Sequence, residues 1–105
     1  MADQLPPPLA IFKKEAPEAF AAFFKLSDAL NASKGIDNKT RQLLTVGIKA
    51  VQGDTIGAVI HTGMAKQAGA TREEVKDVIL NSLTVSGING VIACLGPALE
   101  AYDKK

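Results

Sequence analysis

Residues 54–75 read DTIGAVIHTGMAKQAGATREEV, and this stretch decides the fold. Its first part is an apolar segment of small residues that contains His61, the only histidine of the chain. Apolar residues recur there at three- and four-residue spacing, which predicts a helix from about Asp54 to Ala68. Gly69 is the expected stop of this helix. The TREE run at residues 71–74 is a capping box, so a new helix should begin there.

The helix expected over residues 54–68 is apolar around most of its circumference. Its main apolar stripe consists of Ile56, Val59, Ile60, Gly63 and Met64. A second stripe of small residues runs alongside and consists of Gly57, His61, Ala65 and Ala68, which leaves Thr55, Thr62 and Lys66 as the polar strip. A helix with so little polar surface should be covered on two sides. In a chain of 105 residues, we expect a second subunit to supply part of that cover.

The rest of the chain predicts further helices and no strand. Their expected bounds are about Pro17–Ala32, Asp37 or Asn38 to Gln52, Thr71 to about Ser86, and Asn89 to about Tyr102 with a kink or interruption at Pro97. The run Pro6-Pro7-Pro8 predicts an extended N-terminal arm over residues 1–16. The prediction is therefore an all-α fold, with a bundle of about five helices over residues 17–105.

The composition restricts the class of protein. Hydrophobic residues make up 47% of the chain and charged residues 22%, a balance typical of globular domains. The net charge of +1, with scattered basic residues, gives no reason to expect nucleic acid or an anionic membrane as a partner. A single cysteine, Cys94, excludes an intrachain disulfide and a metal site made of cysteines alone. We see neither a membrane span nor a signal peptide, so we expect a cytoplasmic protein.

The stretch from about Ile36 to Tyr102 resembles the carboxymuconolactone decarboxylase family, which includes the alkylhydroperoxidase D-like proteins. The resemblance is carried by TRQLL at residues 40–44, by Gly53, by His61, and by GATREEV at residues 69–75. It implies an all-helical fold that assembles into a homo-oligomer, a trimer or a hexamer.

The resemblance also shows what this chain lacks. The redox branch of the family carries a Cys-x-x-Cys-x-x-x-His run and a glutamate directly after the arginine of the preceding helix. Such a set supplies a thiolate, a resolving thiol and a proton relay. The matching positions here are Asp54, Gly57 and His61, with Gln42 in place of the glutamate. Both thiols are missing, so we do not expect a dithiol peroxidase or a disulfide reductase.

The decarboxylase branch keeps the histidine and lacks the cysteine pair, and this chain looks closer to that branch. The resemblance implies a decarboxylase (a lyase) that needs no cofactor or metal and acts on a small carboxylated lactone. His61 would be the proton donor, because imidazole titrates near neutral pH. Gln42 would orient the substrate through hydrogen bonds, since an amide cannot act as a base. Arg41 would be the anchor for the substrate carboxylate.

Each of these residues also has a purely structural interpretation. His61 could be a buried histidine at a subunit interface, and Gln42 an ordinary residue of a helix surface. Asp54 fits a helix N-cap better than a ligand, and Cys94 fits a small buried hydrophobe. The alternative to an enzyme is a non-catalytic oligomer of the same fold that binds a small molecule or a partner. A redox role would require an exposed, reactive Cys94.

Overall fold

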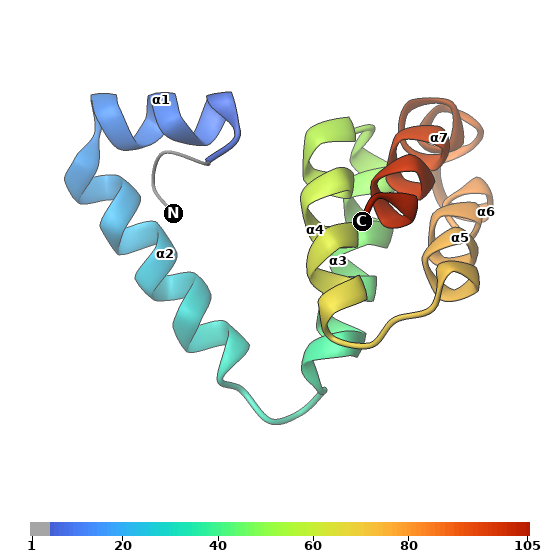
Figure 1. Ribbon diagram of the computed structural model, residues 1–105, viewed down its shortest axis with the longest axis horizontal. Coiled ribbons are helices and arrows are strands. Elements are labelled where there is room, and N and C mark those ends of the chain that lie inside the picture. Colours follow the sequence, from blue (N-terminus) through green and yellow to red (C-terminus); the bar gives the residue numbers. More distant parts are fainter. Residues whose placement is uncertain (1–4) are drawn as a thin grey trace. The chain divides into compact units, whose positions relative to one another are not determined.

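A computed structural model describes residues 5–105, and all regular elements in that range are α-helices (Figure 1). This confirms the all-α prediction for the part of the chain that is described. None of the helices within residues 5–105 is long and apolar enough to cross a bilayer. The chain divides into two compact units, residues 1–34 and residues 35–105.

The first unit contains α1 (Pro7–Glu15) and α2 (Pro17–Asn31). The extended arm expected over residues 1–16 is therefore wrong for Pro7–Glu15; residues 1–4 lie outside the described residues. Pro6 has an extended backbone, with φ −53° and ψ 147°. The N–H groups of a first helical turn have no acceptor within the helix, so prolines at the first two positions of α1 lose no hydrogen bond.

Aromatic rings join α1 to α2. The ring of Phe12 lies edge-on to that of Phe20 at a centroid distance of 5.4 Å and to that of Phe23 at 6.2 Å. The expected boundary at residue 17 would separate these helices, whereas the structure places both in one unit. Neither helix has a buried residue, so this unit has no closed core among its described residues.

The second unit is a bundle in which three helices match predicted ones closely and a fourth predicted helix is divided in two. Its helices are α3 (Asn38–Gln52), α4 (Thr55–Gln67), α5 (Arg72–Leu80), α6 (Leu83–Ser86) and α7 (Asn89–Asp103). Helix α4 packs mainly against α3 and α7, and α5 packs against α7 and α3 (Figure 1). The helix expected from Thr71 to Ser86 is broken by a turn at Asn81 and Ser82, and α7 continues through Pro97 without interruption.

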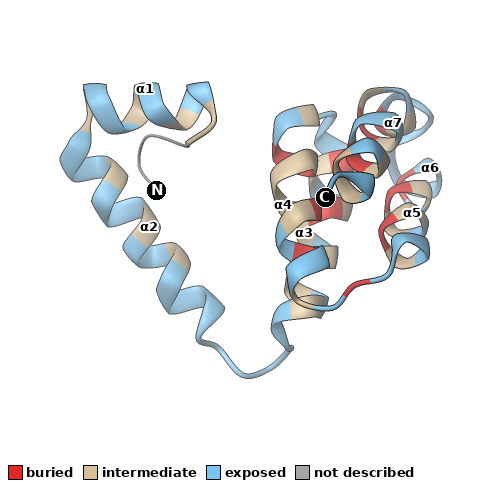
Figure 2. Ribbon diagram, in the orientation of Figure 1, coloured by how far each residue is buried: buried red, intermediate tan, exposed pale blue. Residues whose placement is uncertain are grey.

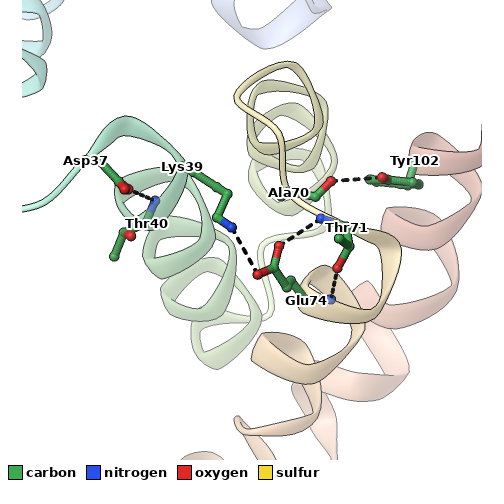
Figure 3. A network of polar contacts seen from close by, with 7 residues as sticks. All are labelled: Asp37, Lys39, Thr40, Ala70, Thr71, Glu74 and Tyr102. Carbon is green, nitrogen blue, oxygen red and sulfur yellow. Dashed lines mark hydrogen bonds and ion pairs between the residues drawn. The ribbon is translucent and has the colours of Figure 1, made fainter.

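Polar groups fix where these helices begin. The Asp37 carboxylate accepts a hydrogen bond from the backbone N–H of Thr40 at 2.8 Å, as expected for the N-cap of α3. The predicted capping box at the start of α5 is confirmed, since Thr71 and Glu74 exchange side-chain to backbone hydrogen bonds (Figure 3).

The start of α5 is also tied to its neighbours. Glu74 forms an ion pair with Lys39 of α3 at 3.1 Å (Figure 3). The hydroxyl of Tyr102 in α7 donates a hydrogen bond to the carbonyl of Ala70 at 2.8 Å. These contacts connect α3, α5 and α7 at one end of the bundle.

The core of the second unit is made largely of small side chains. Figure 2 marks its buried residues in red on the helices of the bundle. Its buried hydrophobic residues are Val46, Ala50, Ala58, Ala65, Ala70, Val75, Ile79, Cys94 and Ala98. Small residues allow helices to approach closely. A Cβ atom on Gly90 of α7, for example, would overlap the backbone carbonyl of Ala50 in α3.

The sequence pattern of α4 left open which of its two apolar stripes faces the core of the chain. In the structure, Ile56 and Met64 of the main stripe are 51% and 38% exposed in the single chain. The small-residue stripe faces inward instead, with Ala65 fully buried. Thr62, expected in the polar strip, is also fully buried. Close packing of α4 against α3 and α7 leaves room for small side chains only, so the larger ones are turned outward.

Candidate functional site

His61 and Gln42 lie in contact where α4 packs against α3. Nδ1 of His61 is 2.8 Å from Oε1 of Gln42, a hydrogen-bond distance. Gln42 is buried, with 3% of its surface exposed, while His61 is only partly buried. Gln42 is one of the buried residues of α3, so it is not the ordinary surface residue of the structural interpretation. The structure therefore brings two of the three predicted site residues together.

Asn38 extends this contact by one residue. The amide Nε2 of Gln42 donates a hydrogen bond to Oδ1 of Asn38 at 3.2 Å. Asn38 is the first residue of α3, and it is exposed. Residues four apart in a helix are neighbours on its surface, so the spacing of Asn38 and Gln42 was the available signal in the sequence.

An ion pair lies on the same side of the bundle. Nζ of Lys49 is 3.3 Å from Oδ2 of Asp54, and both side chains are partly exposed. The other carboxylate oxygen of Asp54 accepts a hydrogen bond from the backbone N–H of Gly57 at 2.8 Å, which confirms Asp54 as the N-cap of α4. This hydrogen bond, with a smaller contribution from Lys49, lowers the pKa of Asp54.

These surroundings lower the pKa of His61. Burial is the largest cause, since it disfavours the charged imidazolium, and the positive charge of Lys49 acts in the same direction. The negative charge of Asp54 opposes both effects. Because the ordinary pKa of histidine is about 6.5, a lowered pKa means that the ring is mostly neutral at pH 7.

Gly57 stands where the redox branch has its second thiol, and the Lys49–Asp54 ion pair fills the space beside it. A Cβ atom on Gly57 would lie 2.6 Å from Oδ2 of Asp54 and 2.7 Å from Cδ of Lys49. Such distances are too short for carbon, so a cysteine at this position would displace both side chains. A single cysteine at residue 57 is therefore incompatible with the present position of the Lys49–Asp54 ion pair.

Arg41, the third predicted site residue, lies on a different face of α3 from Gln42. Successive residues of a helix are about 100° apart around its axis, whereas Asn38, Gln42 and Lys49 are spaced by four and seven residues and share one face. The side chain of Arg41 is partly buried. The structure does not place Arg41 on the face that carries Gln42.

Cys94 is fully buried in the core, as the structural interpretation expected. Burial raises the pKa of its thiol, the nearby Asp54 adds to this effect, and a hydrogen bond with Thr55 partly offsets it. A buried thiol with a raised pKa is a poor nucleophile. Cys94 therefore lacks the exposure that a redox role would require.

The structure also shows an apolar groove that the sequence did not predict. Its volume is about 620 Å³, and it is lined by Leu43, Leu44, Gly47, Ile48, Val51, Asp77, Val78, Asn81, Ser82 and Val85. These residues belong to α3, α5, α6 and the turn between the last two. Its lining does not include His61, Gln42 or Arg41.

Comparison with known proteins places this chain in a family. Over 93% of this chain and 77% of the other, the structure resembles a protein of Burkholderia xenovorans LB400 named as a candidate carboxymuconolactone decarboxylase, with a TM-score of 0.83 and 26% identity. Two uncharacterized proteins of Methanocaldococcus jannaschii are also similar. MJ0742 is 31% identical over 76% of this chain and 78% of its own length, and MJ1511 is 30% identical over 88% and 86%.

A model of the carboxymuconolactone decarboxylase family matches residues 17–100, which include α2 to α6 and most of α7. The match contains His61 and Gln42 as well as the helices that hold them. By this match, and by the similarity in structure, the chain belongs to the carboxymuconolactone decarboxylase family.

Proposed function

We propose that this protein is a cofactor-free decarboxylase acting on a small carboxylated lactone, with His61 as the proton donor. Family membership supports the substrate class. The observation that carries the proposal is the partly exposed His61 ring, held at Nδ1 by Oε1 of the buried Gln42 at 2.8 Å. The contact at Nδ1 thus orients the ring, and Nε2 is left to interact with a ligand.

The reaction needs one proton for each molecule of substrate. When the substrate carboxylate leaves as CO₂, the electrons of the broken carbon–carbon bond stay on the lactone. The carbon that receives them takes a proton from Nε2 of the His61 imidazolium. The neutral ring then takes a proton from water before the next turnover. Because the pKa of His61 is lowered, the resting ring is mostly neutral and the donor form is the minor one at pH 7.

Gln42 and Arg41 have supporting roles in this proposal. Gln42 cannot gain or lose a proton at these pH values, so it orients His61 and the substrate through hydrogen bonds alone. Arg41 would bind a carboxylate of the substrate. Because Arg41 does not share the helix face of Gln42, replacing it should weaken substrate binding more than it slows the chemical step.

We also propose that the protein is a homo-oligomer, a trimer or a hexamer. In the single chain, large apolar side chains are exposed on α3 and α4, where Leu44 is 54% exposed, Ile48 47% and Ile56 51%. Leu44 and Ile48 also line the apolar groove together with Val51 and Val85, and exposed apolar patches are typical of protein interfaces. A second copy packed over α3 and α4 would supply the cover that these faces lack. Sedimentation or light scattering should then give three or six times the mass of one chain, and a stable monomer would contradict this proposal.

The alternative is a family member that binds a small molecule or a partner without turnover. It is favoured by Gln42, an amide at the position where the resemblance places a proton-relaying glutamate. The two functions differ in whether CO₂ is released from carboxymuconolactone. The test compares the wild-type protein with His61→Ala and with the exposed control variant Lys104→Ala. Loss of release in His61→Ala alone supports the enzyme; no release in any of the three, or equal release in all three, contradicts it.

A further inference from the structure

We propose that Lys49 forms a subsite beside His61 that binds a carboxylate retained by the ligand. An ion pair with the carboxylate that leaves as CO₂ would stabilise the substrate more than the transition state, so the partner of Lys49 is one that stays on the lactone. The inference rests on the proposed function for the identity of the substrate, whereas binding of the anion can be measured without turnover. This role is separate from that of Arg41, which lies on a different face of α3.

Two rows of residues place Lys49 next to the contact between Gln42 and His61. On α3, Gln42 and Lys49 are seven residues apart and share one face; on α4, Gly57 and His61 are four residues apart and share another. Gln42 meets His61 at 2.8 Å, and a Cβ atom on Gly57 would lie 2.7 Å from Cδ of Lys49. Because Gly57 has no side chain, the aliphatic part of Lys49 can lie against α4 there. The two rows thus bring Lys49 to α4 about one helical turn, ~5.4 Å, from His61.

The ammonium group of Lys49 keeps donors for a ligand. An ammonium carries three hydrogens, and Nζ of Lys49 lies 3.3 Å from Oδ2 of Asp54 while its side chain stays 31% exposed. The Asp54 carboxylate is itself fixed by the backbone N–H of Gly57, so it holds Lys49 in place. An exposed ion pair of this kind adds little stability. A carboxylate of the ligand can therefore share the ammonium with Asp54 or displace it.

The charges around His61 give this subsite a catalytic consequence. Lys49 and Asp54 are the charges that act on the pKa of the ring, and Lys49 lowers it. From α7, the other helix packed against α4, the charged residues are Glu100, which is exposed, and Asp103, which is engaged in an ion pair. A carboxylate bound to Lys49 offsets the positive charge of the ammonium, so the pKa of His61 should rise. The donor form of the ring is then more populated with substrate bound than in the free protein.

The experiment is an NMR titration of His61, the only histidine, with added γ-butyrolactone-γ-carboxylate at constant ionic strength. This saturated lactone carries one carboxylate, and uncharged γ-butyrolactone is the control ligand. In the wild-type protein, the pKa of His61 should rise by about 1 at saturation, the lower end of the effect of a charge within ~4–6 Å. The uncharged lactone should leave the pKa of His61 unchanged.

Three variants make the test specific. Lys49→Gln removes the charge at a partly exposed position, so it should fold, and it should bind the lactone carboxylate about tenfold more weakly, the effect of losing one hydrogen bond to a charged group. The matched control is Lys76→Gln, because Lys76 is 33% exposed and is paired with Glu73 at 2.9 Å; its affinity should equal that of the wild type. Asp54→Asn keeps an N-cap and removes the competing carboxylate, so it should bind more tightly. An unchanged pKa of His61 in the wild-type protein at the highest ligand concentration, equal affinity in wild type and Lys49→Gln, or the same loss in Lys76→Gln would overturn the inference.

Activity separates this inference from the proposed function. If the protein releases no CO₂ but the pKa of His61 responds to the lactone carboxylate through Lys49, the proposed function fails and the subsite stands. If the protein is active and Lys49→Gln changes neither KM nor the ligand-induced rise in the pKa of His61, the subsite fails and the proposed function stands. With both correct, Lys49→Gln should raise KM about tenfold. In the wild-type protein, the pKa obtained from kcat, which reports the substrate complex, should then exceed that from kcat/KM, and by less in Lys49→Gln.

Discussion

Replacing Gln42 by glutamate should raise the pKa of His61. The side-chain oxygen of residue 42 lies 2.8 Å from Nδ1 of the ring. In Gln42→Glu that oxygen belongs to a carboxylate, which favours the imidazolium by charge and by a stronger hydrogen bond. The change in shape is small, since glutamine and glutamate have the same number of side-chain atoms.

The magnitude follows from two opposing effects at this position. An opposite charge within about 4–6 Å changes a pKa by roughly 1 to 3 in proteins. The lower end applies here for two reasons. His61 is partly exposed, and a carboxylate at residue 42, which is only 3% exposed, would lose hydration. We therefore expect the pKa of His61 to rise by about 1, which corresponds to ~1.4 kcal/mol of added stabilisation of the charged ring.

The assay is an NMR titration of the single imidazole. The matched control is Gln67→Glu, the same chemical change at an exposed position of α4. Gln67 is six residues from His61, so it lies toward the opposite face of the helix, and its pKa effect should be a small fraction of that at residue 42. An unchanged or lower pKa of His61 in Gln42→Glu would refute the geometry of this site. With the pKa raised, the proposed donor form is more populated at pH 7, and the rate of CO₂ release should increase.

Further predictions concern stability and assembly. Gly63→Ala should stabilise α4 by up to ~1 kcal/mol, because its Cβ meets nothing within 4 Å. Gly57→Ala should be about 1 kcal/mol less stable than Gly63→Ala, because its Cβ displaces the capping Asp54; equal melting midpoints would contradict this. Ile48→Lys should lower the mass measured by light scattering while the chain stays helical; an unchanged mass would exclude this face from the interface. Because the pKa of His61 is lower in the folded state, the unfolded state binds the proton more readily. The free energy of unfolding should therefore be level above about pH 6.5 and should fall as the pH drops below that value. In His61→Gln this fall should be absent between about pH 6.5 and 5.5, and urea titrations that show the same fall in both proteins would refute it.

Helix positions could be predicted from the sequence because their signals are local. Asp37 and Thr71 are N-caps whose partners lie three residues away, and Gly69 ends its segment with φ +100°, a left-handed conformation that favours glycine. The prolines at the start of α1 were misread because the same residues suit an extended arm and a first helical turn. Local rules permit both structures, and the aromatic contact of Phe12 with Phe20 comes from packing that the proline pattern does not show.

The orientation of α4 could not be predicted from periodicity. Both stripes of this helix are apolar, and the pattern does not say which one faces inward. The outcome depends on how closely α3 and α7 approach it, which in turn depends on residues distant in sequence such as Gly90. The exposure of Ile56 and Met64 is consistent with a second subunit packed over α4, which the apolar surface of this helix predicted. That subunit contact stays a prediction.

The candidate site was predictable only in part. His61 stood out as the single histidine, and the resemblance drew attention to Gln42. Their direct contact required the packing of α3 against α4. The positions of Asn38 and Lys49 on the face of Gln42 follow from helical spacing, but the ion pair of Lys49 with Asp54 depends on the turn at Gly53, where φ is +69°.

One measurement tests the central claim most directly: the rate of CO₂ release from carboxymuconolactone as a function of pH, set beside the NMR titration of His61 in the same protein. If His61 donates the proton, kcat/KM, which reports the pKa of the free enzyme, should rise as the pH falls through the lowered pKa of the ring, with the same midpoint in both experiments. A rate that does not depend on pH across that midpoint, or that falls as the ring becomes protonated, would contradict the account.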